Sequence, residues 1–304
     1  MKGAPTIPDW IALDWGTTHL RAWLMTADGS VIERRDCDKG MGGLSRDAFE
    51  PVLNDLLSDV ITNTKLPVIC CGMAGSRQGW AEAPYTPVPC VPPSASKATI
   101  VTSANWDVRI LPGVKQNSPA DVMRGEETQI AGFLASEPNF DGILCLPGTH
   151  SKWAHISAGE IISFRTFMTG ELFALIGGQS VLRHSVSTND WDQDAFDAAL
   201  SDTLTRPADL AAKLFSLRAE GLLHNLSPAA ARARLSAFLI GAELASAKPY
   251  WLGQQVVILG ENTIALAYET ALTAQGAMVH CVNAEQMTLA GLNAAFDSLQ
   301  ETKP

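Results

Sequence analysis

Basic residues are scarce in this sequence of 304 residues, where 22 Lys and Arg stand against 32 Asp and Glu. The net charge of −10 and the lack of any basic run exclude the electrostatic footprint of a nucleic-acid-binding protein. An anionic substrate must then be bound by a few well-placed cations. The sequence therefore predicts a small-molecule substrate and no nucleic-acid partner.

Long apolar runs are also missing. No stretch reaches the length of about 18 apolar residues that a membrane span needs, and no long apolar segment follows Lys2. The six cysteines show neither C-x-x-C spacing nor a His at zinc-finger distance. Buried thiols in a reducing compartment explain them best. We expect a cytoplasmic protein without a membrane span or an export signal.

Several common catalytic motifs are absent. The chain has no G-x-x-x-x-G-K-[ST], no G-x-G-x-x-G after a strand, no H-E-x-x-H and no G-x-S-x-G. These absences exclude a P-loop enzyme and give no support to a dinucleotide fold, a common zinc protease or a serine hydrolase. The length and a hydrophobic content of 46% are sufficient for two packed domains. Phosphate chemistry remains as an option.

The most informative feature present is a repeat. Residues Ile11 to Ile32 and Ile143 to Ile162 each read as strand, Gly-Thr turn, strand, hairpin and strand. At each turn the glycine lets backbone N–H groups approach an anion, and a Thr hydroxyl adds a donor. Two ordinary turns are the alternative interpretation. Such a long period favours two domains of like topology that face each other across a cleft.

The two copies of the repeat differ at one important position. Asp14 in the first copy corresponds to Leu146 in the second, so only one loop carries an acid. A carboxylate on one side and neutral donors on the other match a metal–nucleotide site, with Asp14 as the tether for hydrated Mg²⁺. The candidate phosphate donors are Gly16, Thr17, Thr18, Gly148, Thr149 and His150.

A kinase also needs a carboxylate to accept the proton of the acceptor hydroxyl. Glu126 and Glu127 lie at the start of a predicted helix just before the second Gly-Thr turn. The alternative is that both are solvated residues favoured by the helix dipole. Only one of the two can point into a site, and Glu126 is preferred because it falls on the face of Ile130 and Phe133.

Cations and a flat aromatic side chain are the candidates for substrate contact. A glycine-rich turn at residues 72–80, which follows a buried strand, is a plausible ligand loop in an α/β sheet. Packing or surface exposure is the simpler explanation for Trp80 and Lys152. The candidate substrate-binding residues are Arg21, Ser76, Arg77, Trp80, Lys152 and Arg165.

Local patterns predict further elements. Apolar spacing favours a helix over Asp47 to Thr62, and Ser118-Pro119 reads as a helix start. Ser227-Pro228 reads as the N-cap and first residue of an alanine-rich helix, and Ala284 to Leu299 as the closing helix. The crossing between the domains is expected at residues 110–113.

The motifs in this order resemble the 2-dehydro-3-deoxygalactonokinase family of actin-like sugar kinases. They are Asp-Trp-Gly-Thr-Thr from Asp14, Gly-Met-Ala-Gly-Ser from Gly72, Met-Arg-Gly-Glu-Glu-Thr-Gln from Met123, Pro-Gly-Thr-His-Ser-Lys-Trp from Pro147, Thr-Gly-Glu-Leu from Thr169 and Leu-Ile-Gly-Ala-Glu from Leu239. The resemblance covers essentially the whole chain, from about Trp10 to Phe296.

The resemblance implies an α/β fold of two actin-like (ribonuclease H-like) domains with mixed sheets flanked by helices and an ATP cleft between them. The domains expected are residues 1–112, with the first phosphate loop, and 113–304, with the second. It also implies ATP with Mg²⁺, the 6-hydroxyl of 2-dehydro-3-deoxy-D-galactonate as acceptor, and Gly260 and Glu261 on the adenosine side. The chain departs from related sugar kinases in having a single glycine at this last turn and Glu where they usually place Asp as base.

Other assignments remain open at this stage. The chain can be a kinase for another sugar acid, a ketose or a polyol, although an anion-binding arginine such as Arg77 or Arg165 favours an acid. It can also be a non-kinase ATPase of the superfamily, but 304 residues leave little room for a peptide-binding module. A homodimer is neither indicated nor excluded.

Overall fold

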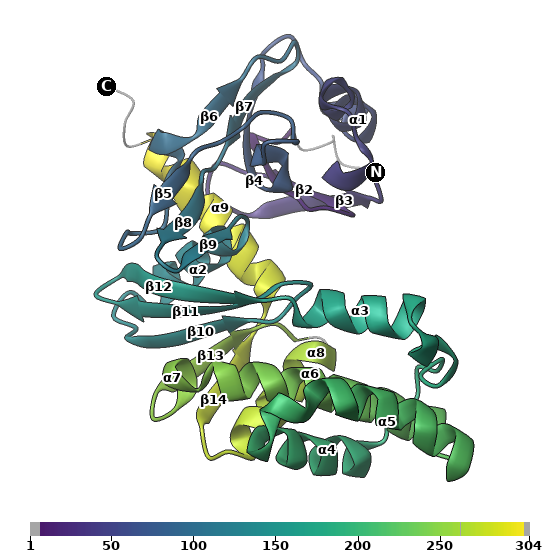
Figure 1. Cartoon of the computed structure of the whole chain (residues 1–304). Helices are drawn as coiled ribbons and strands as arrows, with labels where there is room; N and C mark the ends of the chain where they lie inside the picture. The colour runs from purple at the N-terminus through teal and green to yellow at the C-terminus, as the bar shows by residue number, and fades with distance from the viewer. Residues whose placement is uncertain (1–6, 262, 301–304) are drawn as a thin grey trace, which may run out of the picture. The chain divides into compact units, whose positions relative to one another are not determined.

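The structure of the chain is a computed structural model that describes residues 7–261 and 263–300. These residues form two compact units (Figure 1). Unit 1 is Met1–Phe140, Ile156–Ser163 and Asn283–Pro304 as far as these are described, and unit 2 is Asp141–His155 and Phe164–Val282. No helix in the described ranges is both long and apolar enough to cross a membrane.

Unit 1 contains a six-stranded mixed sheet in the order β3-β2-β1-β4-β7-β6. Its strands are β1 (Trp10–Trp15), β2 (Leu20–Met25), β3 (Val31–Cys37), β4 (Leu66–Gly72), β6 (Thr99–Val101) and β7 (Trp106–Ile110). A three-stranded sheet is formed by β5 (Tyr85–Pro87), β8 (Gly113–Asn117) and β9 (Ala120–Met123), and the helices are α1 (Phe49–Leu56), α2 (Glu126–Ser136) and α9 (Ala284–Gln300). Strand β1 is apolar almost throughout because both faces of this central strand are covered.

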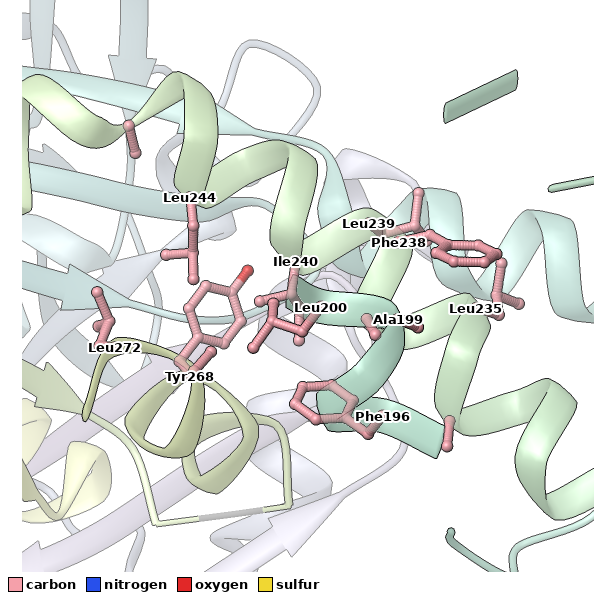
Figure 2. Close-up of a cluster of buried hydrophobic side chains, with 14 of the residues drawn as sticks. Phe196, Ala199, Leu200, Leu235, Phe238, Leu239, Ile240, Leu244, Tyr268 and Leu272 are labelled. Atoms are coloured by element: carbon pink, nitrogen blue, oxygen red, sulfur yellow. The ribbon is translucent and has the colours of Figure 1, made fainter. Parts of the chain in front are cut away.

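Unit 2 is built on a five-stranded sheet in the order β12-β11-β10-β13-β14. Its strands are β10 (Gly142–Leu146), β11 (Ser151–Ser157), β12 (Glu160–Phe167), β13 (Gln255–Leu259) and β14 (Met278–Val282). Its helices are α3 (Thr169–Gln179), α4 (Gln193–Thr205), α5 (Leu210–Leu223), α6 (Pro228–Ser246), α7 (Lys248–Trp251) and α8 (Thr263–Thr273). Figure 2 shows part of the apolar core, where Tyr268 of α8 lies among side chains such as Ile240 and Leu244 of α6.

The two large sheets repeat one topology. In each, the first three strands lie next to one another in reverse order, and parallel strands follow, β4 and β7 in unit 1 and β13 and β14 in unit 2. This is the strand order of ribonuclease H-like domains, from which actin-like ATPases are built. The predicted fold class is confirmed, and so is the predicted strand–turn–strand–hairpin–strand repeat.

The unit boundary does not coincide with the one expected from the sequence. A division after residue 112 assigns residues 113–140 to the second domain, whereas β8, β9 and α2 belong to unit 1 by their contacts. Helix α2 packs on α9, and β8 pairs with β5, so both contacts hold this segment in unit 1. The chain first passes from unit 1 to unit 2 between Phe140 and Asp141.

Local predictions were correct for most helices and wrong for one start. Ser227 caps α6 by accepting a hydrogen bond from the N–H of Ala230, and the closing helix is α9. Ser118-Pro119 does not begin a helix, because these residues form the turn between the paired strands β8 and β9. Helix α2 begins at Glu126, after Gly125 turns the chain with φ of 106°. Helix α1 is shorter than expected and ends at Leu56.

Helices α2 and α9 approach so closely that glycine is needed at their contact. A Cβ added at Gly132 would lie 1.9 Å from the carbonyl oxygen of Met287, and one at Gly291 would lie 2.0 Å from that of Thr128. These backbone atoms cannot move without shifting a whole helix. The contact fixes α9, which carries a charged residue of the site described below, against unit 1.

Gly132→Ala is expected to destabilise the protein by about 1–3 kcal/mol, because the methyl group overpacks the α2–α9 contact. Gly221→Ala in α5 is the matched control, since a Cβ there meets nothing within 4 Å. This control should be neutral or stabilising by up to about 1 kcal/mol. Urea unfolding midpoints measure both, and equal midpoints for the two variants would contradict the predicted close contact.

Candidate active site

Asp14 lies near the carboxyl end of β1 and is paired in register with Arg21 of β2. Its side chain is 17% exposed, and its Oδ2 lies 3.6 Å from Nη2 of Arg21. Burial raises the pKa of Asp14, the Arg21 guanidinium opposes this, and the carboxylates of Glu126 and Glu285 raise the pKa further. Negative charge therefore gathers around Asp14, as it does in sites that bind cations.

Glu285, in the first turn of α9, is a part of this cluster that the sequence did not reveal. Its Oε2 lies 3.7 Å from Nη1 of Arg21, and its Oε1 accepts a hydrogen bond of 2.8 Å from Nε of Arg34. Arg21 is therefore an ion-pair partner of two acids. Its predicted contact with substrate remains a prediction. Acidic residues are common at helix starts, so the position of Glu285 in the sequence did not predict its ion pair with Arg21.

Glu126 and Glu127 begin α2 and have different environments. The carboxylate of Glu126 accepts a hydrogen bond of 3.0 Å from the N–H of Arg124. Glu126 is partly exposed, and it lies close enough to Asp14 to raise the pKa of Asp14. Glu127 is only 2% exposed, and both of its oxygens accept from the N–H of Gly125. Burial raises the pKa of Glu127 to about 8.

The facing argument from the sequence was therefore wrong, because Glu127 is the glutamate that shares the buried side of α2 with Ile130 and Phe133. The choice of Glu126 as base nevertheless has support, since Glu126 is the partly exposed glutamate beside Asp14. Close backbone packing makes this arrangement possible. A Cβ at Gly125 would lie 3.4 Å from Cα of Gly72, and one at Gly72 would lie 3.3 Å from Oδ1 of Asp14.

The first Gly-Thr turn is held by a second glycine-rich loop. The N–H groups of Gly40 and Gly42 donate to the carbonyl oxygens of Thr18 and Thr17 at 3.1 and 2.9 Å. A Cβ at Gly40 would lie 2.3 Å from the carbonyl carbon of Thr18, so only glycine fits there. Thr17 and Thr18 are exposed in the turn that follows β1, and phosphate binding by this turn remains a prediction.

The second Gly-Thr turn is held by the start of α3 in unit 2. The N–H of Glu171 donates to the carbonyl oxygen of Thr149 at 2.9 Å, and Nε2 of His150 lies 2.5 Å from Oε2 of Glu171. A Cβ at Gly170 would lie 2.2 Å from the carbonyl oxygen of Gly148. The loop and the amino end of α3 therefore form one rigid block, in which His150 already has a carboxylate partner.

A pocket of about 410 Å³ opens beside Gly148 within unit 2. It lies between α3, α6 and α8, and the residues that line it include Gly148, Thr169, Phe173, Arg232, Thr263 and Tyr268. The guanidinium carbon of Arg232 lies 5.1 Å from the centre of the Phe173 ring. Aromatic and apolar walls with a few hydroxyl groups suit a flat heterocyclic ligand.

The predicted adenosine residues lie just before this pocket. Gly260 follows β13 directly, its N–H donates to the carbonyl oxygen of Val282 at 2.8 Å, and Glu261 is exposed. Asn262 lies outside the described residues. Helix α8 follows at once and supplies Thr263 and Tyr268 to the pocket. The other walls of the pocket come from α3 and α6. These helices are distant from the Gly260 turn in the sequence, so a short motif could not predict that they lie beside it.

The predicted substrate residues are divided between the units. Ser76, Arg77 and Trp80 belong to unit 1, and Lys152 and Arg165 to unit 2. Trp80 is 7% exposed and stacks with Phe49 in the core, which is the packing role that the sequence left open. Lys152 is buried at 4% exposure rather than on the surface, whereas Arg77 is exposed. Substrate contact by these side chains remains a prediction.

Arg124 is a buried cation that the sequence did not single out. It is 8% exposed, its Nη2 donates to the carbonyl oxygen of Ala83 at 2.7 Å, and its guanidinium lies 4.3 Å from the Tyr85 ring centre. Within the described residues, its Nε and Nη1 have no hydrogen-bond partner. A Cβ at Gly75 would lie 2.7 Å from Nη1, so the glycine-rich turn makes room for this guanidinium.

Comparisons with known proteins agree with this architecture. The family described as 2-keto-3-deoxy-galactonokinase matches residues 14–295. A probable 2-dehydro-3-deoxygalactonokinase of Rhizobium meliloti (strain 1021) is 41% identical over 93% of this chain and 95% of its own, and the 2-dehydro-3-deoxygalactonokinase of Escherichia coli (strain K12) is 36% identical over 94% and 96%.

Solved structures extend the likeness to three dimensions. A protein of Sinorhizobium meliloti proposed to be a 2-dehydro-3-deoxygalactonokinase superposes with a TM-score of 0.89 at 40% identity, over 95% of this chain and 99% of its own. Component A of the (R)-2-hydroxyglutaryl-CoA dehydratase of Acidaminococcus fermentans shares only the fold, with a TM-score of 0.53 at 12% identity over 97% and 99%. With its matched family, its relatives and its repeated topology, the chain belongs to the 2-keto-3-deoxy-galactonokinase family.

Proposed function

We propose that this protein transfers the γ-phosphoryl group of ATP to the 6-hydroxyl of 2-dehydro-3-deoxy-D-galactonate. The observation that carries the proposal is a pair of acids, Asp14 near the end of β1 and the partly exposed Glu126 at the start of α2, in a chain of this kinase family. Kinases need few covalent steps, because positioning and electrostatic stabilisation supply most of the rate. The acids in unit 1 and the pocket in unit 2 provide the groups for both tasks.

The pocket beside Gly148 is proposed to hold the adenosine part of ATP. Its volume of about 410 Å³ lies in the range of small-molecule sites, and its walls include Phe173, Tyr268 and Arg232. Gly148 also belongs to the second Gly-Thr turn, so a nucleotide seated there has its phosphates next to the predicted donors Thr149 and His150. Phosphate binding by these groups is part of the proposal.

The acidic cluster also fits Mg²⁺. The ion takes one or two carboxylates, keeps several waters and binds substrate phosphates, so it does not need a cage of protein ligands. Within the described ranges no group of three or more metal-binding side chains exists, but Asp14 provides a half-buried carboxylate in a surplus of negative charge. Bound Mg²⁺ would neutralise the charge of the phosphates.

The residues of the chain then act as follows. The 6-hydroxyl oxygen of the sugar acid attacks the γ-phosphorus, the bond to the bridging oxygen breaks and ADP leaves. Glu126 accepts the proton of the hydroxyl, and the hydrogen bond from the N–H of Arg124 holds its carboxylate in place. Asp14 keeps its charge beside Arg21, whose other partner is Glu285. The enzyme is further proposed to act in the cytoplasm on small soluble metabolites and to bind no nucleic acid.

A coupled assay of ADP release tests the proposed function. Purified protein with ATP and MgCl₂ is expected to turn over 2-dehydro-3-deoxygalactonate at least about 10-fold faster, as kcat/KM, than its gluconate epimer or glycerol. Steady ATP hydrolysis that none of these compounds accelerates would instead indicate a non-kinase ATPase. Preference for glycerol would assign the protein to the polyol kinases.

A further inference from the structure

Glu243 on α6 is a buried carboxylate that the proposed chemistry does not use. It is 3% exposed, and it lies in the last turn of α6, the longest helix of unit 2. Burial raises the pKa of Glu243, and the hydroxyl and indole groups that donate to its oxygens oppose this effect. A buried acid is costly unless its oxygens are well satisfied, so its presence here needs a reason.

Three different elements donate to this one side chain. Trp153 of β11 donates through Nε1 to Oε1 at 2.7 Å, and Tyr268 of α8 donates through its hydroxyl to Oε2 at 2.6 Å. Thr169, the first residue of α3, also donates to Oε2, and Ser151 of β11 lies 2.9 Å from the Tyr268 hydroxyl. Glu243 thus connects α3, α8 and the strand that follows the second Gly-Thr turn to α6.

Each of these elements borders the pocket or the loop beside it. Thr169 and Tyr268 line the pocket themselves, and the residue after Thr169 packs against the carbonyl of Gly148. Figure 2 shows the Tyr268 ring among apolar side chains. The hydrogen bond from its hydroxyl to Glu243 is the polar contact that holds the ring in place. The hydroxyl groups of Thr169 and Tyr268 are thereby turned to Glu243.

We infer that Glu243 is a positioning residue for the nucleotide, which holds α3, α8 and the second Gly-Thr turn at the spacing that ADP and ATP require. The inference rests on the proposal that the pocket holds the nucleotide. Since a satisfied buried network is rigid and specifies one arrangement, loss of its central acceptor frees two pocket walls at once. The effect should be largest on nucleotide binding, because Thr169 and Tyr268 line the pocket, whereas the candidate base Glu126 lies in unit 1.

Calorimetric titration with ADP tests this role. Glu243→Leu removes the acceptor at similar volume and is expected to raise the Kd of ADP at least about 10-fold, the size of one lost buried hydrogen bond or more. Glu243→Gln keeps one acceptor oxygen for Trp153 and should show a smaller rise. Steady-state kinetics should show the same order in KM for ATP, with a smaller change in KM for the sugar acid.

Glu220→Leu is the matched control. Glu220 lies on α5 and accepts two hydrogen bonds from Arg234 of α6, so it also joins a helix to α6, but it does not line the pocket. It is expected to lower thermal stability and leave the Kd of ADP unchanged.

If Glu243→Leu does not fold, Tyr268→Phe decides, since it keeps the ring and removes one donor to Glu243. A Kd of ADP unchanged in Glu243→Gln and Tyr268→Phe, or raised equally by Glu220→Leu, would overturn the positioning role. Failure of the unmodified protein to bind ADP would instead overturn the proposed function.

Discussion

Asp14→Asn is expected to lose at least about 100-fold in kcat, the size typical of removing one electrostatic contact to a transition state. The amide keeps the shape of the side chain and removes the charge that would hold hydrated Mg²⁺ against the phosphates. Folding should not suffer. Because burial raises the pKa of Asp14, its ionised form costs stability in the folded state, and that cost grows as pH rises through the shifted pKa. The variant should therefore melt at the same temperature as the unmodified protein or higher at neutral pH.

Asp38→Asn provides the control for this substitution. Asp38 also lies near the first Gly-Thr turn, where it pairs with His19 at 3.0 Å, but its side chain is 92% exposed. Exposed ion pairs contribute little, so this variant should keep nearly full turnover. The measurements are kcat at saturating ATP, sugar acid and MgCl₂, and thermal melts of both variants. Near-normal turnover by Asp14→Asn would exclude the tether role, and a markedly lower melting temperature would mean that its carboxylate is structural.

The parts of the site that lie within one short segment could be predicted from the sequence. Asp14 and the Gly-Thr turn that follows are local, because a strand that ends in Gly-Thr places its donors by backbone geometry alone. The repeat then predicted two similar sheets, which the strand orders confirm. Family resemblance added the substrate, which no spacing rule could provide.

What the sequence did not reveal comes from long-range packing. Glu285 reaches Arg21 only because α9 returns to unit 1 and packs there on α2 through glycine contacts. Glu243 ends one of the motifs that carry the family resemblance, but its donors come from residues as far away in the sequence as Trp153. Such contacts depend on the fold as a whole, so a local pattern carries no trace of them.

The wrong predictions have physical causes as well. Ser118-Pro119 has the composition of a helix start, but pairing of β8 with β9 makes it a hairpin turn, so a tertiary contact overrode the local signal. Helical facing did not predict which of the two glutamates is buried, because both side chains bend back to accept from backbone N–H groups, Glu126 from Arg124 and Glu127 from Gly125. A side chain that caps its own helix is not placed by periodicity.

The two glutamates can be separated by the same conservative change at each. Glu126→Gln is expected to lower kcat by about 10²- to 10⁴-fold, the usual loss for a positioned general base, with the Kd of ADP little changed. Glu127→Gln should keep kcat within a few-fold of the unmodified protein, because Glu126 still accepts the proton. Glu127 is 2% exposed, and with its pKa raised to about 8 by burial it is mostly protonated at pH 7, so the amide closely copies its shape and charge.

Stability against pH gives Glu127 a signature of its own. A carboxyl whose pKa is raised in the folded state contributes no penalty at low pH, and stability is lost as pH rises toward and through about 8, where the buried group must ionise. The unmodified protein should therefore lose stability between pH 7 and pH 9, and Glu127→Gln should lose the least. Glu126→Gln should lie between the two, because the carboxylate of Glu126 also raises the pKa of Glu127. Urea midpoints at the two pH values measure this difference. A large loss of kcat in Glu127→Gln alone would transfer the base to that residue, and normal kcat in both variants would place the proton acceptor outside this pair.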